Sequence, residues 1–270
     1  MIRLKEQLRK IDEQKRYYRI LLNKSRFRHE LETHIWAMAA DLTSHFDLVP
    51  SSGIEHQKTA EGLFMAFETV RQADKTQLSV PFVRDTHAQT LAFENPQAAG
   101  YLRNLRARWL NSTMIVANPA KVPYLLEQLV AGVNMGHVPA FYWDECPDRS
   151  FQQCARHPVM QAIETNYNVV AIHPFCDGNK RIARLISAWI LDKYGHIPLS
   201  IYNRADYISS IENYFNTRRP HLLYQLMFEQ MRQSYDYAIC EARSLDRLKI
   251  YAPLKHCQTK KELNAKQFLR

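Results

Sequence analysis

The sequence predicts an all-α protein, and three observations carry this prediction. Only seven of the 270 residues are glycine, so the chain has few of the residues that interrupt regular structure. Long segments of charged and apolar residues follow the period of a helix, and few follow the period of two that marks a half-buried strand. With 46% hydrophobic residues, a chain of this length can bury one large core. We therefore expect a helical bundle.

The first 48 residues are predicted to form a basic helical region with one or two long helices. They contain neither Gly nor Pro, and their apolar residues recur at roughly helical spacing until Pro50 ends the pattern. Ser51 or Ser52 can cap the next helix, which is predicted over about residues 54–71.

The middle of the chain is predicted to be mixed. Residues 74–100 follow no single pattern, and we interpret Pro81 as a helix breaker. A helix is predicted over residues 98–110. Residues 112–117 are the one convincing β-like passage, and an amphipathic helix is predicted over residues 122–134.

The C-terminal half is predicted to contain two buried helices joined by a short loop. The first spans residues 157–172, where the apolar content rises and Pro158 suits a first helical turn. The second follows the loop and stops at Gly195, a residue type common just past a helix end. Two further helices to about residue 245 and a polar, lysine-rich tail complete the chain.

The chain carries an excess of positive charge, with 36 Lys and Arg against 27 Asp and Glu. A net charge of +9 favours an acidic partner such as a nucleic acid, a phosphorylated ligand, an acidic protein or an anionic membrane surface. Ten of the basic residues lie within the first 30 positions, and we interpret them as a solvated helix face. Without a helix-turn-helix, zinc-finger or RNP signature, nucleic acid is not expected as a partner.

Other features of the sequence indicate a compartment. No apolar segment approaches the roughly 20 residues that a membrane span needs, and the charged N-terminus has no secretory apolar region. The five cysteines are odd in number and irregularly spaced, which favours reduced thiols. Cys146, Cys154 and His157 lack the second close-spaced pair that a tetrahedral metal site needs. We expect a cytoplasmic bacterial protein, or one delivered into a host cell as an effector.

The sequence HPFCDGNKRIAR, from His173 to Arg184, starts with the loop between the two buried helices. The residue types in this sequence are suited to binding a phosphate. Gly178 precedes a helix start and can adopt a positive φ, so that successive N–H groups can turn toward an anion. The positive end of the helix adds to this field. Arg181 and Arg184 can bind phosphate oxygens from the first turns of the helix.

The acid and the histidine of the loop complete this interpretation. Asp177 would repel an anion unless a divalent cation lay between them, and Mg²⁺ is the natural ion at a phosphate. His173 is then placed to accept a proton from an incoming hydroxyl. Taken one residue at a time, the loop fits a purely structural motif. Taken jointly, its residues indicate phosphoryl or nucleotidyl transfer.

This loop closely resembles the Fic family signature, HPFx(D/E)GNxRxxR, and matches it at every fixed position. The resemblance extends more loosely over residues 50–240. It implies an all-α Fic fold with a short β-hairpin flap, and the transfer of AMP from ATP to a hydroxyl side chain of a target protein. We accordingly divide the chain into an N-terminal basic helical region (1–48), a Fic domain (49–240) and a polar C-terminal tail (241–270).

The resemblance also implies roles for single residues. His173 would be the general base, Asp177 would hold Mg²⁺, and Phe175 would fix the loop in the core. The segment after residue 204 resembles the nucleotide-side helix of the family, although the usual Asn-x-Gly-Asp is missing there and Tyr214 stands in the Asn place. The residues implied to bind the nucleotide and its phosphates are Asp177, Gly178, Asn179, Lys180, Arg181, Arg184 and Tyr207.

A segment far upstream resembles the inhibitory pattern of the family, Ser/Thr-x-x-x-Glu-Gly/Asn. Ser51 and Glu55 match it on a helix predicted near residues 51–71, and His56 stands where Gly or Asn is usual. A carboxylate on a helix beside the site could pair with Arg184 and displace the outer phosphate of ATP. The resemblance therefore implies autoinhibition by an N-terminal helix.

Two points bear on partners and on the reaction. Residues 112–117 look like the flap, which would bind a target protein as an added strand, and automodification is also possible. Lys180 stands where many members have glycine, and the Doc-type phosphotransferase branch shares Asn-Lys-Arg but lacks the final arginine that Arg184 supplies here. AMP transfer is therefore the leading hypothesis, phosphate transfer the second, and a non-catalytic partner-binding module the third.

Overall fold

The computed structural model describes residues 2–47, 53–107, 114, 116–136 and 157–251. Within these ranges the chain forms nine α-helices and one short 3₁₀ helix, with no strand, which confirms the all-α prediction. None of the described helices is both long and apolar enough to cross a membrane. In chain order the helices are α1 (Ile2–Lys24), α2 (Arg28–Asp47), α3 (Gly53–Gln72), α4 (Val80–Leu91), η1 (Pro119–Lys121), α5 (Val122–Asn134), α7 (Pro158–Ile172), α8 (Asn179–Lys193), α9 (Arg204–Thr217) and α10 (His221–Tyr251).

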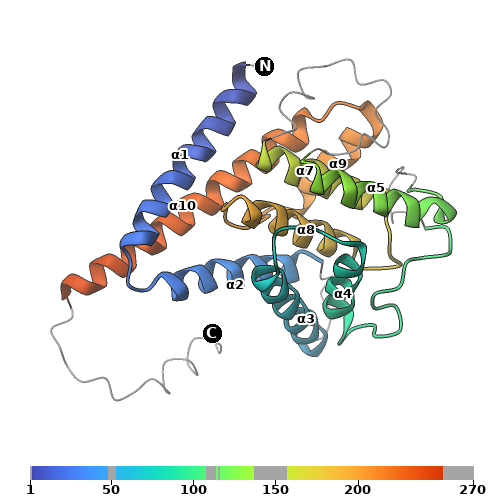
Figure 1. The fold of residues 1–270 in the computed structure, drawn as a ribbon, viewed down its shortest axis with the longest axis horizontal. Coiled ribbons are helices and arrows are strands. Elements are labelled where there is room, and N and C mark those ends of the chain that lie inside the picture. Colours follow the sequence, from blue (N-terminus) through green and yellow to red (C-terminus); the bar gives the residue numbers. More distant parts are fainter. Residues whose placement is uncertain (1, 48–52, 108–113, 115, 137–156, 252–270) are drawn as a thin grey trace.

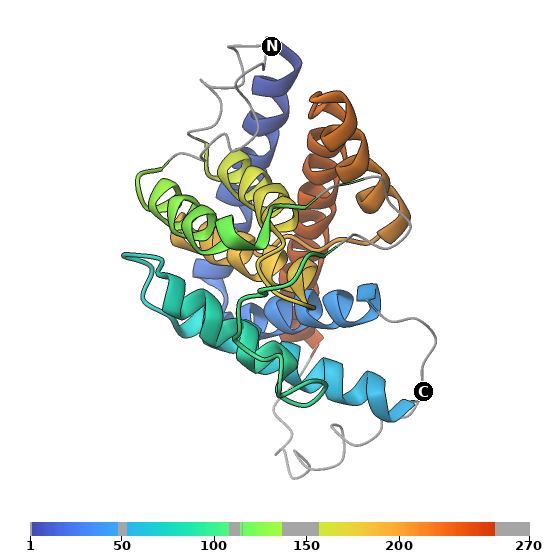
Figure 2. The same cartoon turned by 90° about the vertical axis from the view of Figure 1, so that its right-hand side faces the viewer.

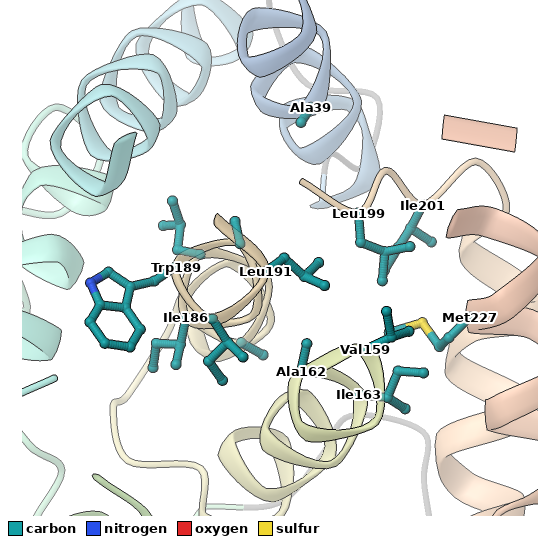
Figure 3. Close-up of a cluster of buried hydrophobic side chains, with 14 of the residues drawn as sticks. Ala39, Val159, Ala162, Ile163, Ile186, Trp189, Leu191, Leu199, Ile201 and Met227 are labelled. Carbon is teal, nitrogen blue, oxygen red and sulfur yellow. The ribbon is translucent and has the colours of Figure 1, made fainter. Parts of the chain in front are cut away.

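The two helices α7 and α8 lie at the centre, and almost every residue of both is buried. The α3–α4 pair lies on one side of them, and α9 and α10 lie on the other (Figures 1 and 2). Figure 3 shows Ile186 of α8 and Ala162 of α7 in one cluster of buried side chains, with Trp189 directed toward the α3–α4 side. Met227 of α10 extends the same core. The loop between α7 and α8 is therefore fixed by the best-packed part of the molecule.

The basic N-terminal helix packs along the last helix instead of standing alone. Figure 1 shows α1 and α10 side by side, and Gln14 of α1 donates a hydrogen bond to Asp236 of α10 at 2.6 Å. Lys15 donates to the carbonyl of Tyr194, just past the end of α8, at 2.7 Å. His157 caps α7 and contacts Asp12 at 3.2 Å. The N-terminal region is thus joined to the rest of the helical core.

A close approach of α3 and α4 depends on Gly62. A Cβ atom at this position would lie 2.8 Å from the carbonyl oxygen of Thr90 and 3.0 Å from that of Gln89. These are backbone atoms, so they cannot turn aside as a flexible side chain could. Glycine therefore permits the packing that brings α3 and α4 together on one side of α8.

Two sequence predictions in the middle of the chain were wrong. Pro81 does not break a helix but occupies the first turn of α4, where its missing N–H costs nothing, and Ser79 caps the helix. Residues 98–107 are not helical. Gly100 has a φ of +77°, and Leu102 forms an isolated antiparallel bridge with Phe175. The chain here crosses to the α7–α8 loop instead of continuing as a helix.

The predicted β-hairpin flap is not seen among the described residues. Met114 and Val116 are buried without strand structure, and the N–H of Ala117 donates to the carbonyl of Ala171 at 3.2 Å. The end of this segment is thus bonded to the C-terminal turn of α7 instead of to a second strand. The rest of the predicted flap, residues 108–113 and 115, lies outside the described residues. The domain boundaries remain predictions, and α10 continues beyond residue 240 to Tyr251.

Candidate active site

His173 ends α7 in an unusual backbone conformation. Its φ of 53° and ψ of 60° place it in the left-handed region, and its N–H closes the helix onto the carbonyl of Val169 at 2.9 Å. A residue with a Cβ atom takes this conformation only when its surroundings impose it, and such residues gather at functional sites. The turn takes the chain from the end of α7 into the loop that begins α8.

The side chain of His173 is held neutral at physiological pH. Burial lowers its pKa to about 4, and the carbonyl of Val170 opposes this effect. The positive charges of Arg103 and Lys180 lower the pKa further, against the opposing charge of Asp177. A neutral imidazole can accept a proton, which is what a general base requires.

Arg103 holds the backbone on both sides of His173. Its buried guanidinium donates to the carbonyls of Ile172 (3.2 Å) and His173, and its backbone N–H donates to the carbonyl of Pro174 at 2.9 Å. The same guanidinium donates to the carbonyl of Ala117. Arg103 therefore ties three consecutive carbonyls of the loop to the segment that precedes η1.

The loop is also closed on itself by Asn179. Its side-chain oxygen accepts from the N–H of Phe175 at 2.9 Å, and its side-chain nitrogen donates to the carbonyl of the same residue at 2.8 Å. Both ends of this amide are thus used within the loop. Gly178 has a φ of 72° and forms the N-cap of α8, as its sequence position predicts. What Asn179 can offer an anion is its backbone N–H at the start of the helix.

His87 of α4 packs against the α7–α8 loop and is hydrogen-bonded to it. Its ring stacks on Phe175 with 3.7 Å between centroids and 6° between planes. Its Nδ1 accepts from the N–H of Gly100 at 2.9 Å, so Nε2 carries the proton and donates to the carbonyl of Asp177 at 3.0 Å. Burial lowers the pKa of His87 to about 4, which keeps this neutral form. A Cβ on Gly178 would lie 3.3 Å from the ring nitrogen of His87, so this contact also favours glycine.

Three basic residues follow on α8. Arg181 is buried and pairs with Glu94, which lies in the turn after α4, at 2.9 Å. Arg184 is buried one turn later on the same helix, and Lys180 is partly exposed beside the loop. The N-terminal end of α8 thus combines the positive end of a helix dipole with three cationic side chains.

Asp177 is the one acidic side chain of the loop, and it is exposed. Its carboxylate accepts from the N–H of Gly178 at 2.6 Å, which directs it across the N-terminal end of α8. Among the described residues there is no group of three or more acidic, histidine or cysteine side chains that could hold a metal ion alone. A single exposed carboxylate fits a Mg²⁺ ion that takes its other ligands from phosphates and water.

The two tyrosines of α9, Tyr207 and Tyr214, are buried, and the role of Tyr207 in nucleotide binding stays a prediction. Tyr207 is fully buried, and its hydroxyl donates to the side-chain oxygen of Asn166 on α7. Tyr214 is buried against Tyr167, with 4.3 Å between ring centroids, and its hydroxyl donates to Glu164 at 3.2 Å. The structure thus places both hydroxyls on polar groups of α7, which join α9 to the central helices.

The predicted inhibitory segment is only partly described. Glu55 lies in the first turn of α3, and α3 packs against α8. The side chain of Glu55 and the whole of Ser51 lie outside the described residues, as do Cys146 and Cys154.

Three residues of this site were missed by sequence reasoning, namely His87, Glu94 and Arg103. No local pattern marks them, because their partners lie about 70 to 90 positions away along the chain. Arg103 is one of several arginines in a segment that reads as an exposed helix. The bridge between Leu102 and Phe175 would have shown that Arg103 lies next to the α7–α8 loop, but this bridge can be seen only in the folded chain.

Comparisons with known proteins agree with this geometry. The sequence model of the Fic/DOC family matches residues 77–191. The Caenorhabditis briggsae protein named protein adenylyltransferase fic-1 is 26% identical over 170 residues, which cover 61% of this chain and 30% of that protein. The chain therefore spans less than a third of the length of this curated relative.

Two solved structures share the fold. Fic-1 from Caenorhabditis elegans superposes with a TM-score of 0.68 at 18% identity, covering 89% of this chain and 73% of that one. A Fic-domain-containing signalling protein from Bacteroides thetaiotaomicron superposes with a TM-score of 0.61 at 17% identity, covering 89% and 95%. The family match includes α4, α5, α7, most of α8 and the loop that begins at His173, so residues 77–191 of this chain form a domain of the Fic/DOC family.

Proposed function

We propose that this protein is a protein adenylyltransferase, which transfers AMP from ATP to a hydroxyl side chain of a target protein. The observation that carries the proposal is the placement of a neutral histidine beside a helix N-terminus that bears three cations. The name of the curated relative supports the same activity.

In the proposed reaction, His173 accepts the proton of the target hydroxyl as its oxygen attacks the α-phosphorus of ATP. A new P–O bond forms to the hydroxyl oxygen, the bond between the α- and β-phosphates breaks, and pyrophosphate leaves. The N–H groups at the start of α8 and the guanidinium of Arg181 hold the phosphates during this step. Arg184 binds the outer phosphate and sets the register of the nucleotide.

Asp177 would hold Mg²⁺ at the phosphates. When bound, the ion neutralises phosphate charge that would otherwise repel this carboxylate. The exposed position of Asp177 at the start of α8 supports this role.

We also propose that Glu55 restrains the activity. The packing of α3 against α8, the helix that carries Arg184, supports this proposal. Pairing of Glu55 with Arg184 would deny the arginine to the outer phosphate of ATP. The segment at residues 112–117 is proposed to bind the target backbone. The hydrogen bond from the N–H of Ala117 to the carbonyl of Ala171 supports this proposal, because it holds the end of the segment near the α7–α8 loop.

Phosphate transfer is the second candidate, and Lys180 is the observation that favours it. Its ammonium lies close enough to lower the pKa of His173, so it also lies near the atoms that react. Incubation of the full chain with ATP labelled at the α- or the γ-phosphate, read by gel after adding cell lysate, separates the two reactions. Transfer of the α-label alone supports AMP transfer, transfer of the γ-label alone supports phosphate transfer, and transfer of neither supports a binding module.

A further inference from the structure

Arg103 holds the proposed general base in place from outside the family motif. It is 3% exposed, and its contacts to Ile172, His173 and Pro174 fix the carbonyls on both sides of the left-handed residue. Because a left-handed residue with a Cβ atom is retained only when its surroundings impose it, these contacts are what the conformation of His173 requires.

The same guanidinium joins the loop to the segment before η1. It donates to the carbonyl of Ala117 and, at 2.9 Å, to that of Leu105. A second bond between these parts runs from the N–H of Ala117 to the carbonyl of Ala171 at 3.2 Å. The end of the proposed target-binding segment and the base therefore share one cation, which sets the distance between them.

We propose that Arg103 is a positioning residue for the transfer reaction, which fixes the direction of His173 and its distance from the target-binding segment without touching ATP. This inference rests on the proposed function. Displacement of a reacting group by about 1 Å can cost about 100-fold in rate. Loss of Arg103 should therefore lower kcat and leave the KM for ATP unchanged.

The experiment compares Arg103→Gln, Arg103→Lys and the matched control Arg106→Gln in the full chain. Arg106 is an exposed arginine three positions away. We expect kcat for α-label transfer to fall about 100-fold in Arg103→Gln, with KM for ATP within about twofold of wild type. Arg103→Lys keeps the charge but loses the planar guanidinium that donates several hydrogen bonds, so kcat should fall about tenfold. Arg106→Gln should match the wild type.

A second measurement does not need activity. Four groups set the pKa of the His173 ring besides burial, namely the Val170 carbonyl, Arg103, Asp177 and Lys180. In spectra of histidine-labelled protein, with the His173 signal assigned by its loss in His173→Ala, Arg103→Gln should move the titration of His173 upward from about pH 4. Arg103→Lys should leave it near the wild-type value, because the charge remains.

The outcomes separate the two proposals. If the wild type transfers no α-label, the proposed function fails, and the titration still decides whether Arg103 sets the surroundings of His173. If Arg103→Gln or Arg103→Lys is folded by circular dichroism and has the wild-type kcat, the positioning role is overturned. A KM for ATP that rises as much as kcat falls overturns it as well, because Arg103 would then be a ligand of the nucleotide.

Discussion

Two titratable side chains, the buried Glu164 in the middle of α7 and the partly buried His173 at its C-cap, are both held neutral. Burial raises the pKa of Glu164 to about 8, against the opposing hydrogen bond from Tyr214, and lowers the pKa of His173 to about 4. The cause is the same, because burial disfavours whichever form is charged. The surroundings differ, since Glu164 is enclosed by the hydroxyls of Tyr214 and Tyr224, whereas His173 faces the loop that begins α8.

The difference teaches what makes a buried group useful for catalysis. Glu164 is 7% exposed, and its carboxyl group joins α7 to α9 and α10 through the hydroxyls of Tyr214 and Tyr224. His173 is only partly buried, and charged groups of the loop lie next to it. Desolvation sets the protonation state of both, and access decides that only one can exchange a proton with a substrate.

The largest expected effect on activity is at Asp177, which lies in the same loop that His173 faces. Asp177→Ala should abolish label transfer, because the carboxylate that would hold Mg²⁺ at the phosphates is lost. Asp177→Asn keeps an oxygen to accept from the N–H of Gly178 but removes the charge, so it should be equally inactive. Normal transfer by Asp177→Asn in Mg²⁺ would show that the charge is not needed. The measurement is α-label incorporation across a range of Mg²⁺ concentrations.

The next effect is at His173 itself. Replacement of His173 with Ala should lower the transfer rate by about 10²–10⁴, because the general base is removed, and should leave ATP binding largely intact. Rates at saturating ATP, together with a direct binding titration, check both parts. Labelling by His173→Ala at the wild-type rate would contradict the mechanism.

A smaller effect, in the opposite direction, is expected at Glu55. A charge-assisted contact with Arg184 is worth about 1.5–3 kcal/mol, so Glu55→Gly should raise automodification and target labelling by about tenfold to 150-fold. The control is Glu61→Gly, which places the same helix-weakening change, about 1 kcal/mol, at an exposed glutamate of α3. If Glu55→Gly is folded and no more active than Glu61→Gly, the inhibitory role is wrong.

The smallest effect concerns Glu164 and is seen in stability instead of activity. Because its folded pKa of about 8 lies above its usual value, the folded state binds a proton that the unfolded state releases. Glu164 therefore makes stability fall as pH rises toward 8. Between about pH 7 and 8, where unfolded histidines are mostly neutral, Glu164→Gln should flatten the fall of the melting temperature.

The control for this prediction is Glu229→Gln, at an exposed glutamate of α10. It should retain the wild-type slope, because its site is solvated. Equal slopes in the wild type and Glu164→Gln would mean that Glu164 is already ionised in the folded protein, and the contrast with His173 would be lost.

The sequence predicted the central helices and the loop between them because their signals are local. Pro158 at the start of α7, Gly195 after α8 and Gly178 at positive φ each act within a few residues of their own position. The segment at residues 98–107 was predicted wrongly because its signals are not local. The contacts that Arg103 makes with the end of α7 join residues about 70 positions apart, and no helical period reports them.

Contacts between residues far apart in the sequence also explain why the hydrogen bonds of Tyr207, Tyr214 and Glu164 were not predicted. The resemblance to the nucleotide-side helix gave no indication that the hydroxyl of Tyr207 donates to Asn166 in the core. Glu164 reads in the sequence as one polar residue in an apolar helix. Its partners Tyr214 and Tyr224 come from two other helices, so the pair of hydroxyls could be found only after α9 and α10 were placed.

The contacts of Arg103 have a consequence for hydrogen exchange. The loop after α7 and the carbonyl of Ala117 are both bonded to the guanidinium of Arg103, so movement of either is expected to disturb the other. Amides on the two sides should therefore exchange through a single cooperative opening, with one free energy, although more than 50 residues separate them along the chain. A local fluctuation that exposes the loop alone is therefore expected to be rarer than an opening that also frees the carbonyl of Ala117.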